Sequence, residues 1–301
     1  MHEGSKGAIA AAAGANLGIA IAKFAGFLVT GASSMLAEAI HSMADTANQG
    51  LLILGGARAA RPATPEHPFG YGRDRYFWAF VVALVLFMVG GLFAVYEGVD
   101  KLRHPHEISS PAVAFAILGV AAVLESFSLR TAVRAAAPER GTMSWTRYVR
   151  RSKSPELPVV LLEDLGALFG LVFALIGLTL AVVTDEPRFD GAATLAIGLL
   201  LVVIAVILVV EMKSLLIGEA ATPEQQRMIQ AGIEGTPQVS GLLHMRTLHL
   251  GPDELLVAAK IELAAGLDSA AVAAAINAAE ARIREAVPIA RAIYLEPDIR
   301  A

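Results

Sequence analysis

Long apolar segments, separated by short polar stretches, occupy the first two thirds of the chain. A helix needs about 20 residues to cross about 30 Å of hydrocarbon. Six stretches reach that length: residues 8–30, 34–57, 77–99, 111–133, 157–183 and 191–216. Ser33 and Ser34 mark the turn between the first two, and Asp185-Glu186-Pro187 separates the last two. The pattern predicts an α-helical membrane protein whose transport domain, residues 1–217, has six transmembrane helices.

Residues 218–301 have the pattern of a water-soluble domain. Thr222, Pro223 and Gln225 carry the signature of a helix N-terminus, with an N-cap, a proline in the first turn and a capping box. Strand patterns follow over 242–250 and 255–263, then an Ala-rich helix capped by Asp268, and a last strand over 289–295. The order αββαβ predicts a small, ferredoxin-like α+β domain with helices on one face of a sheet.

The basic residues of the loops are unevenly divided between the two sides of the membrane. The loops after the second and fourth spans hold 11 of them: Arg58, Arg61, Arg73, Arg75, Arg130, Arg134, Arg140, Arg147, Arg150, Arg151 and Lys153. The other side holds 3: Lys101, Arg103 and Arg188. Because basic loops favour the cytoplasmic side, we expect both termini to be cytoplasmic. A net charge of −4 gives no indication of nucleic-acid binding.

The composition agrees with a membrane protein and limits its metal chemistry. Hydrophobic residues make up 55% of the chain and charged residues 17%, against about 25% charged in a typical soluble domain. The absence of cysteine excludes disulfides and thiolate metal sites. Any transition-metal ion would therefore be bound by His, Asp, Glu or neutral oxygen atoms.

The second span carries a polar stripe within its apolar sequence. Glu38, His41, Asp45 and Asn48 follow one another in steps of 3, 4 and 3, which keeps them on one face of a helix. Ionisable groups inside a membrane are costly and are functional by default. An imidazole and a carboxylate one turn apart are half of a site for a divalent transition metal. For Asn48, a hydrogen bond that joins two helices is an equally good explanation.

Further ionisable residues lie in three other spans. Glu163 and Asp164 are adjacent in the fifth span, and neighbouring helical residues point about 100° apart. We therefore expect Asp164 to face the site, with Glu163 joining it or pairing with a group such as Lys23. Glu125 in the fourth span and Lys23 in the first are candidates for supporting the ligands or carrying protons, or for forming a structural ion pair.

Histidines outside the spans have simpler explanations. His104 and His106 lie with Glu107 in a short outward loop, where we expect solvated side chains, with metal collection as the alternative. His67 lies at the entry to the third span, in a predicted turn. His249 is expected to be a strand residue whose ring faces solvent.

Several motifs together resemble those of the cation diffusion facilitator family, over nearly the whole chain. They are Asn16 and Lys23, Gly31-Ala32-Ser33-Ser34, the run from Ala37 to Asp45, the run from His67 to Arg73, and Asp190-Gly191. The Leu-Leu-Glu-Asp run that ends at Asp164 is similar to the branch of the ninth mammalian zinc transporter. The resemblance implies a homodimer that exchanges a divalent cation for protons.

The resemblance also implies a set of metal ligands. In the family, the second and fifth spans supply a tetrahedral site for Zn²⁺ or a similar ion. His41 and Asp45 match the first ligand pair, and Asp164 matches the second aspartate. Val160 stands where the remaining ligand is expected, and it cannot bind a metal ion. Glu163, or Glu38, Asn48 or water, would complete the shell, and more oxygen ligands would admit Mn²⁺ or Fe²⁺.

The C-terminal domain departs from the family pattern as well. In the family this domain often binds additional metal near a dimer interface. His244 matches one such position, but Lys260 stands where a histidine ligand is often found. Glu296-Pro297-Asp298 replaces a His-x-Asp ending. We therefore expect this domain mainly to dimerise.

Together these features predict a transporter rather than an enzyme. The expected function is efflux of a divalent cation, Zn²⁺ in the first place, by a proton-coupled homodimer in the cell inner membrane, with no cofactor. An intramembrane metalloenzyme is disfavoured, because the chain has no His-Glu-x-x-His motif and no nucleophile paired with a base. Two alternatives stay open: an exporter of Mn²⁺ or Fe²⁺, and a non-transporting metal sensor or scaffold.

Overall fold

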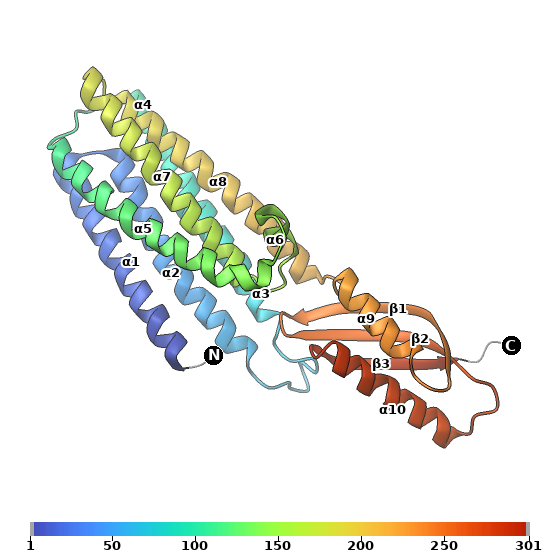
Figure 1. Cartoon of the computed structure of the whole chain (residues 1–301). Coiled ribbons are helices and arrows are strands. Elements are labelled where there is room, and N and C mark those ends of the chain that lie inside the picture. The colour runs from blue at the N-terminus through green and yellow to red at the C-terminus, as the bar shows by residue number, and fades with distance from the viewer. Residues whose placement is uncertain (1–2, 299–301) are drawn as a thin grey trace. The chain divides into compact units, whose positions relative to one another are not determined.

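The computed structural model describes the backbone of residues 3–298, and the side chains from residue 16 to residue 298. The chain forms two compact units (Figure 1). The first comprises Met1–Gly56 and Phe77–Met212, and the second comprises Ala57–Tyr76 and Lys213–Ala301.

Helices occupy all six predicted spans. Their bounds are α1 Glu3–Thr30, α2 Ser33–Ala59, α3 Asp74–Val85 continuing through a π-helical segment Leu86–Leu92 into α4 Phe93–Arg103, α5 Pro111–Arg140, α7 Glu156–Thr184 and α8 Arg188–Ile217. Within the described residues, four segments are long and apolar enough to cross a membrane: Asp74–Arg103, Pro111–Arg140, Glu156–Thr184 and Arg188–Ile217. The described part of α1 is a shorter apolar helix, Asn16–Thr30. The α-helical membrane fold is thus confirmed.

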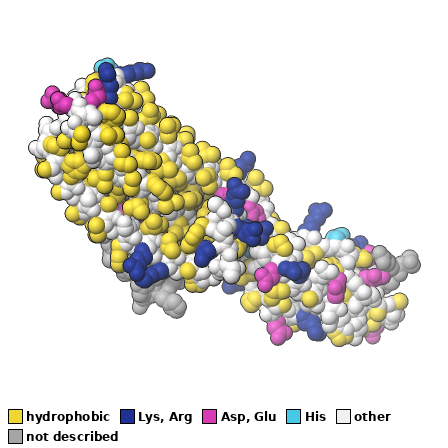
Figure 2. Space-filling model, turned by 45° about the horizontal axis from the view of Figure 1, so that its top comes forward, with side chains coloured by type: hydrophobic (Ala, Val, Ile, Leu, Met, Phe, Trp, Pro, Cys, Tyr) yellow, Lys and Arg dark blue, Asp and Glu magenta, His cyan; other side chains and the backbone are white. Residues whose placement is uncertain are grey.

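The outward faces of these helices suit a lipid environment. Val123 and Phe127 on α5 are 70% and 72% exposed, and Val183 on α7 is 77% exposed. Such side chains would be unfavourable in water but are at no disadvantage in hydrocarbon. Figure 2 shows hydrophobic side chains over most of the visible face of the first unit.

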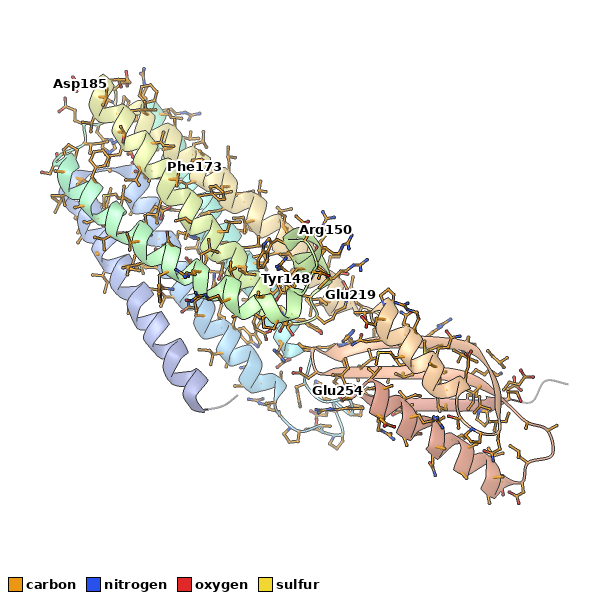
Figure 3. All side chains as sticks on the ribbon, viewed as in Figure 1. Tyr148, Arg150, Phe173, Asp185, Glu219 and Glu254 are labelled. Atoms are coloured by element: carbon orange, nitrogen blue, oxygen red, sulfur yellow. The ribbon has the colours of Figure 1, made fainter. Side chains whose placement is uncertain are left out.

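The loop between α5 and α7 contains a helix that the apolar pattern did not predict. This helix is α6, Trp145–Arg151, and its Tyr148 is buried in a small apolar cluster with Ala132, Ala136 and Leu161 (Figure 3). The Tyr148 hydroxyl donates a hydrogen bond of 3.0 Å to Glu139 Oε2. Burial and this neighbouring carboxylate raise the pKa of Tyr148.

Glycines bring α4 and α8 into backbone contact. A Cβ atom on Gly98 would lie 2.5 Å from the backbone N of Leu195, and one on Gly198 would lie 2.5 Å from the backbone N of Val95. No side chain fits at either position without separating the helices. Small residues that allow this approach are a usual basis of helix association in membranes, so α4 and α8 form one tightly packed pair.

Replacing Gly198 by alanine should separate this pair. Gly198→Ala places a methyl group against backbone rather than against a flexible side chain, so we expect destabilisation of about 1–3 kcal/mol. The measurement is the midpoint of thermal unfolding in detergent. Gly119→Ala is the control, because a Cβ atom there meets nothing within 4 Å. Equal midpoints for the two variants would contradict the proposed packing.

The second unit has the predicted αββαβ order. Its elements are α9 Pro223–Glu234, β1 Val239–Gly251, β2 Glu254–Leu263, α10 Ser269–Ala286 and β3 Ala290–Asp298. The strands form one sheet in the order β1-β2-β3, with β1 antiparallel and β3 parallel to β2. A parallel neighbour requires a crossover connection, which α10 supplies. The predicted caps are present, since Thr222 and Gln225 form a capping box and Asp268 accepts from Ala271 N.

The helices of this unit cover one face of the sheet. Alternate residues of β2, from Leu255 to Leu263, are buried in a core with Ile229 and Ile233 of α9 and Ile283 of α10. This alternation is the period-2 pattern of a strand with one buried face.

The expectation that His249 faces solvent is wrong, because its side chain is only 1% exposed. The chain that leads from α8 into α9 pairs with β1 beside this residue. His249 N donates to Glu219 O at 2.9 Å, and Ala221 N donates to Thr247 Oγ1 at 2.9 Å. A strand pattern does not show what packs over the strand.

The loop between α2 and α3 belongs to the second unit. Gly72 approaches the β1–β2 turn so closely that a Cβ atom would lie 2.7 Å from Leu250 O. Arg75 Nη1 lies 2.9 Å from Asp253 Oδ2 in that turn. His67 lies in a tight turn with Thr64, as expected.

Candidate functional site

The polar stripe of α2 faces the interior of the first unit. Glu38, His41 and Asn48 are fully buried, and Asp45 is 8% exposed. They lie on one face because the helix continues without interruption through Ser33–Ala59. The sequence spacing therefore predicted this burial correctly, although burial alone assigns no ligand.

His41 and Asp45 form the most unusual pair of the stripe. His41 Nδ1 lies 3.5 Å from Asp45 Oδ1. Within the described part of the chain, neither ring nitrogen of His41 has a hydrogen-bond partner, and neither has Asp45 Oδ1. Buried polar atoms are nearly always paired, so each exception requires an explanation.

Lys23 of α1 pairs with the stripe rather than with Glu163. Its Nζ lies 2.9 Å from Glu38 Oε2 and donates to Ser42 Oγ at 2.8 Å. Lys23 and Glu38 are both fully buried. This ion pair lies about one helical turn from His41, because Glu38 precedes His41 by three residues.

The two acidic residues of α7 point toward different helices. Asn48 Nδ2 of α2 donates to Glu163 Oε1 at 2.6 Å. Ser128 Oγ of α5 donates to Asp164 Oδ2 at 3.0 Å. The divergence follows from the angle of about 100° between adjacent helical residues. Glu163 thus contacts the α2 stripe directly, and Asp164 lies between α7 and α5.

Glu125 joins the same group of charges. From α5 it interacts electrostatically with Lys23, Asp45, His41 and Asp164. Its side chain is 5% exposed. Four helices, α1, α2, α5 and α7, therefore contribute ionisable side chains to one region of the first unit.

The side chains are near one another but do not form a ready-made ion shell in this conformation. Among the described residues, no three His, Asp or Glu side chains are arranged so that they could hold one metal ion. The nearest pair is His41 and Asp45, while Glu163 and Asp164 are each held by a neutral hydrogen-bond donor.

Val160 lies against a group of apolar side chains. It packs against the apolar cluster that contains Tyr148, at the end of α7 that faces α5 and α6. A hydrophobic side chain at position 160 is consistent with this apolar packing.

Sequence reasoning missed three residues that support the charged groups. Ser42 and Ser128 donate to charged side chains, and their positions, four after Glu38 and three after Glu125, could have indicated them. Gly170 makes room for Glu38, since any Cβ atom there would collide with Glu38 Oε1. Nothing in the sequence around Gly170 signalled this contact.

The remaining histidines lie elsewhere. The side chain of His104 is 74% exposed, and its Nδ1 lies 3.1 Å from Asp100 Oδ1. His244 lies opposite Lys260 in the sheet, and Lys260 lies opposite Glu296. Lys260 Nζ is 3.0 Å from Asp298 Oδ2 and 3.3 Å from Glu296 Oε1. These two carboxylates raise the pKa of Lys260, which keeps an ammonium group at this position.

A family model, the cation efflux transmembrane domain, matches residues 9–217. The chain belongs to the cation efflux family. This confirms the resemblance seen in the motifs of the spans. Members of the cation efflux family are transporters and not enzymes, and they are multi-pass membrane proteins, as the apolar helices of this chain also indicate.

Several members of the family are similar to this chain in sequence. The proton-coupled zinc antiporter SLC30A9, mitochondrial, of Homo sapiens is 34% identical over 243 residues, which are 80% of this chain and 43% of that protein. Metal tolerance protein C4 of Arabidopsis thaliana is 27% identical over 80% of this chain and 53% of its own length. Magnetosome protein MamM of Magnetospirillum gryphiswaldense is 27% identical over 75% of this chain and 67% of its own.

The match to SLC30A9 agrees with the branch suggested by the Leu-Leu-Glu-Asp run. The chain nevertheless spans less than half the length of the SLC30A9 proteins that it matches. Family membership therefore establishes the transporter class, and the ion, the coupling and the assembly are treated below.

Proposed function

We propose that this chain exports a divalent metal ion, Zn²⁺ in the first place, in exchange for protons. The observation that carries the proposal is the buried His41–Asp45 pair, whose ring nitrogens and Oδ1 have no hydrogen-bond partner among the described residues. In a tetrahedral shell with metal–ligand bonds of about 2.0–2.1 Å, two ligand atoms lie about 3.3 Å apart. The 3.5 Å between His41 Nδ1 and Asp45 Oδ1 is close to that separation.

The rest of the shell comes from α7. Asp164 is the third ligand in this proposal, and Glu163 is a fourth, less direct one, because it already contacts Asn48 of the same stripe. A rotation of the Asp164 side chain away from Ser128 would bring its carboxylate toward Asp45, with which it interacts electrostatically. Glu38, Asn48, Glu125 and Lys23 would support these ligands or carry protons.

Proton exchange follows from the chemistry of the ligands. A metal ion binds deprotonated carboxylates and neutral imidazole, so protons and metal ions compete for the site. Imidazole is the side chain whose charge changes nearest to neutral pH. His41 is therefore the proposed proton-sensitive ligand. The name of the human relative, a proton-coupled zinc antiporter, supports this coupling.

The assembly and topology are part of the same proposal. We place the protein in the cell inner membrane as a homodimer, with both termini in the cytoplasm and the second unit as the dimerisation domain. In that unit the Lys260 ammonium, held between Glu296 and Asp298, takes the place of a bound cation. The second unit would accordingly not bind metal at this position.

The oxygen-rich ligand set favours one second candidate, an exporter of Mn²⁺ or Fe²⁺. With His41 as the only nitrogen ligand, the shell is harder than one with several imidazoles, and harder shells suit Mn²⁺ better.

The test is metal flux into proteoliposomes with an imposed pH gradient, using Zn²⁺, Mn²⁺ and Fe²⁺. We expect flux of Zn²⁺ above the other ions, and loss of flux when the gradient is collapsed. Preferred flux of Mn²⁺ or Fe²⁺ would favour the second candidate. No flux of any ion, with metal still bound, would favour a sensor or scaffold and contradict the proposal.

A further inference from the structure

A second buried polar cluster lies at the N-terminal end of α2, around Asp190. Asp190 is in the first turn of α8 and is fully buried. Its Oδ2 accepts from Ser33 N at 2.8 Å, and its Oδ1 accepts from Ser34 N at 3.4 Å and from the Ser34 hydroxyl. The side chain that accepts from the first N–H groups of α2 therefore comes from α8 and not from the residues just before α2.

The position of Asp190 is electrostatically favourable. The first N–H groups of a helix have no partner within the helix and carry a partial positive charge. A carboxylate at this place pairs two of them in the interior of the protein. Ser33, in addition, donates its hydroxyl to Glu97 Oε1 of α4 at 2.8 Å.

Lys101 of α4 is the counterpart of Asp190. It is fully buried, and its Nζ donates to His106 O at 2.7 Å and to Gly31 O at 3.4 Å. Gly31 closes the end of α1, since its N–H donates to Phe27 O. A cation at the C-terminal end of a helix is favourable for the same reason that an anion is at the N-terminal end. Lys101 therefore binds the end of α1 while Asp190 binds the start of α2.

Both charges belong to the tightly packed α4–α8 pair. A Cβ atom on Gly191, the neighbour of Asp190, would lie 3.0 Å from Lys101 Cγ. The α4–α8 pair thus holds both ends of the α1–α2 turn. The loop between α4 and α5 is attached at the same place, because Ser109 N donates to Thr30 O at 2.7 Å.

We propose that Lys101 and Asp190 form a latch that closes this end of the first unit, and that ion release toward this side requires the α1–α2 turn to separate from α4 and α8. The proposal rests on the proposed transport function. His41 lies about two helical turns beyond Ser33 on the same helix. Movement of the latched end of α2 would therefore open a path toward His41.

The absence of cysteine from the chain allows a direct test. Ala37, between Ser33 and His41 on α2, is 2% exposed. In Ala37→Cys the new side chain is the only thiol, and its reaction with a membrane-impermeant thiol reagent, added from the side of the α1–α2 turn, reports access to the interior. We expect Asp190→Asn to accelerate this reaction about tenfold, as loss of one charged hydrogen bond implies.

The control is Asp185→Asn, the same chemical change at an exposed position in the turn before α8 (labelled in Figure 3). It should leave the labelling rate unchanged. Equal rates for Asp190→Asn and Asp185→Asn would overturn the latch. If Asp190→Asn does not fold, Ser34→Ala, which removes one donor and keeps the carboxylate, should still accelerate labelling, by a smaller factor, and no acceleration there would also overturn it.

Flux distinguishes failure of the latch from failure of the proposed function. In Asp190→Asn, Zn²⁺ binding should be unchanged. Zn²⁺ should, however, cross the membrane of the proteoliposomes even without a pH gradient. Faster labelling of Asp190→Asn, together with no ion transport by the wild type, would contradict the transport function but retain the latch. Normal coupled transport with unchanged labelling in Asp190→Asn would retain the function and refute the latch.

Discussion

We expect Asp45→Asn to lower the rate of metal transport by at least about 100-fold. The change keeps the size of the side chain and removes its charge, so the carboxylate opposite His41 becomes a weak neutral ligand. Loss of a residue that only supports a ligand typically costs 10–100-fold in metal affinity or activity, and loss of a ligand should cost more. The measurement is initial Zn²⁺ flux in proteoliposomes, with Zn²⁺ binding measured on the same preparation.

The control for this variant is Asp268→Asn in the second unit. Asparagine caps a helix about as well as aspartate, so the Asp268 cap over α10 should be retained. Transport by Asp45→Asn at the wild-type rate would remove His41 and Asp45 from the proposed site. Asp164→Asn should behave like Asp45→Asn. Loss of binding in Asp164→Asn but not in Glu163→Gln would place Glu163 outside the ligand shell.

Lys23→Met should destabilise the protein by about 3–5 kcal/mol, because it leaves the buried Glu38 carboxylate without its counter-charge. Methionine retains most of the apolar stem of lysine, so the loss of packing is small. The measurement is unfolding in detergent. The double variant Lys23→Met/Glu38→Gln should recover most of the stability, because no unpaired charge then remains.

An exposed lysine provides the matched control. Lys213→Met, near the end of α8, makes the same change at an exposed position. The free energy of unfolding of Lys213→Met should be close to that of the wild type. A double variant as unstable as Lys23→Met alone would show that Lys23 stabilises the bundle by some contact other than its pair with Glu38.

The elements of this fold were largely predictable because their signals are local. Six apolar stretches of sufficient length became helices, and the Thr222–Gln225 capping box began α9 where it was expected. The helix α6 was not predicted, because seven residues with four polar or basic side chains, Thr146, Arg147, Arg150 and Arg151, have no apolar period to detect. The burial of His249 was also not predictable, because a strand pattern does not show what packs over the strand.

The candidate site likewise has features that the sequence predicted and features that it did not. Spacing placed Glu38, His41, Asp45 and Asn48 on one face, because a helix repeats every 3.6 residues whatever surrounds it. Spacing could not assign partners. Lys23 was a candidate partner for Glu163, and the structure pairs it with Glu38.

By itself, the sequence determined that this is a multi-pass membrane protein with buried ionisable residues and a separate αββαβ unit, because hydrophobic length, helical period and caps act over a few residues. Only the tertiary structure decided which charges meet. It paired Lys23 with Glu38 and Asn48 with Glu163, and it brought Asp190 to the start of α2 from 157 residues away. Such contacts depend on how helices pack against one another, and packing is a property of residues that are distant in the chain.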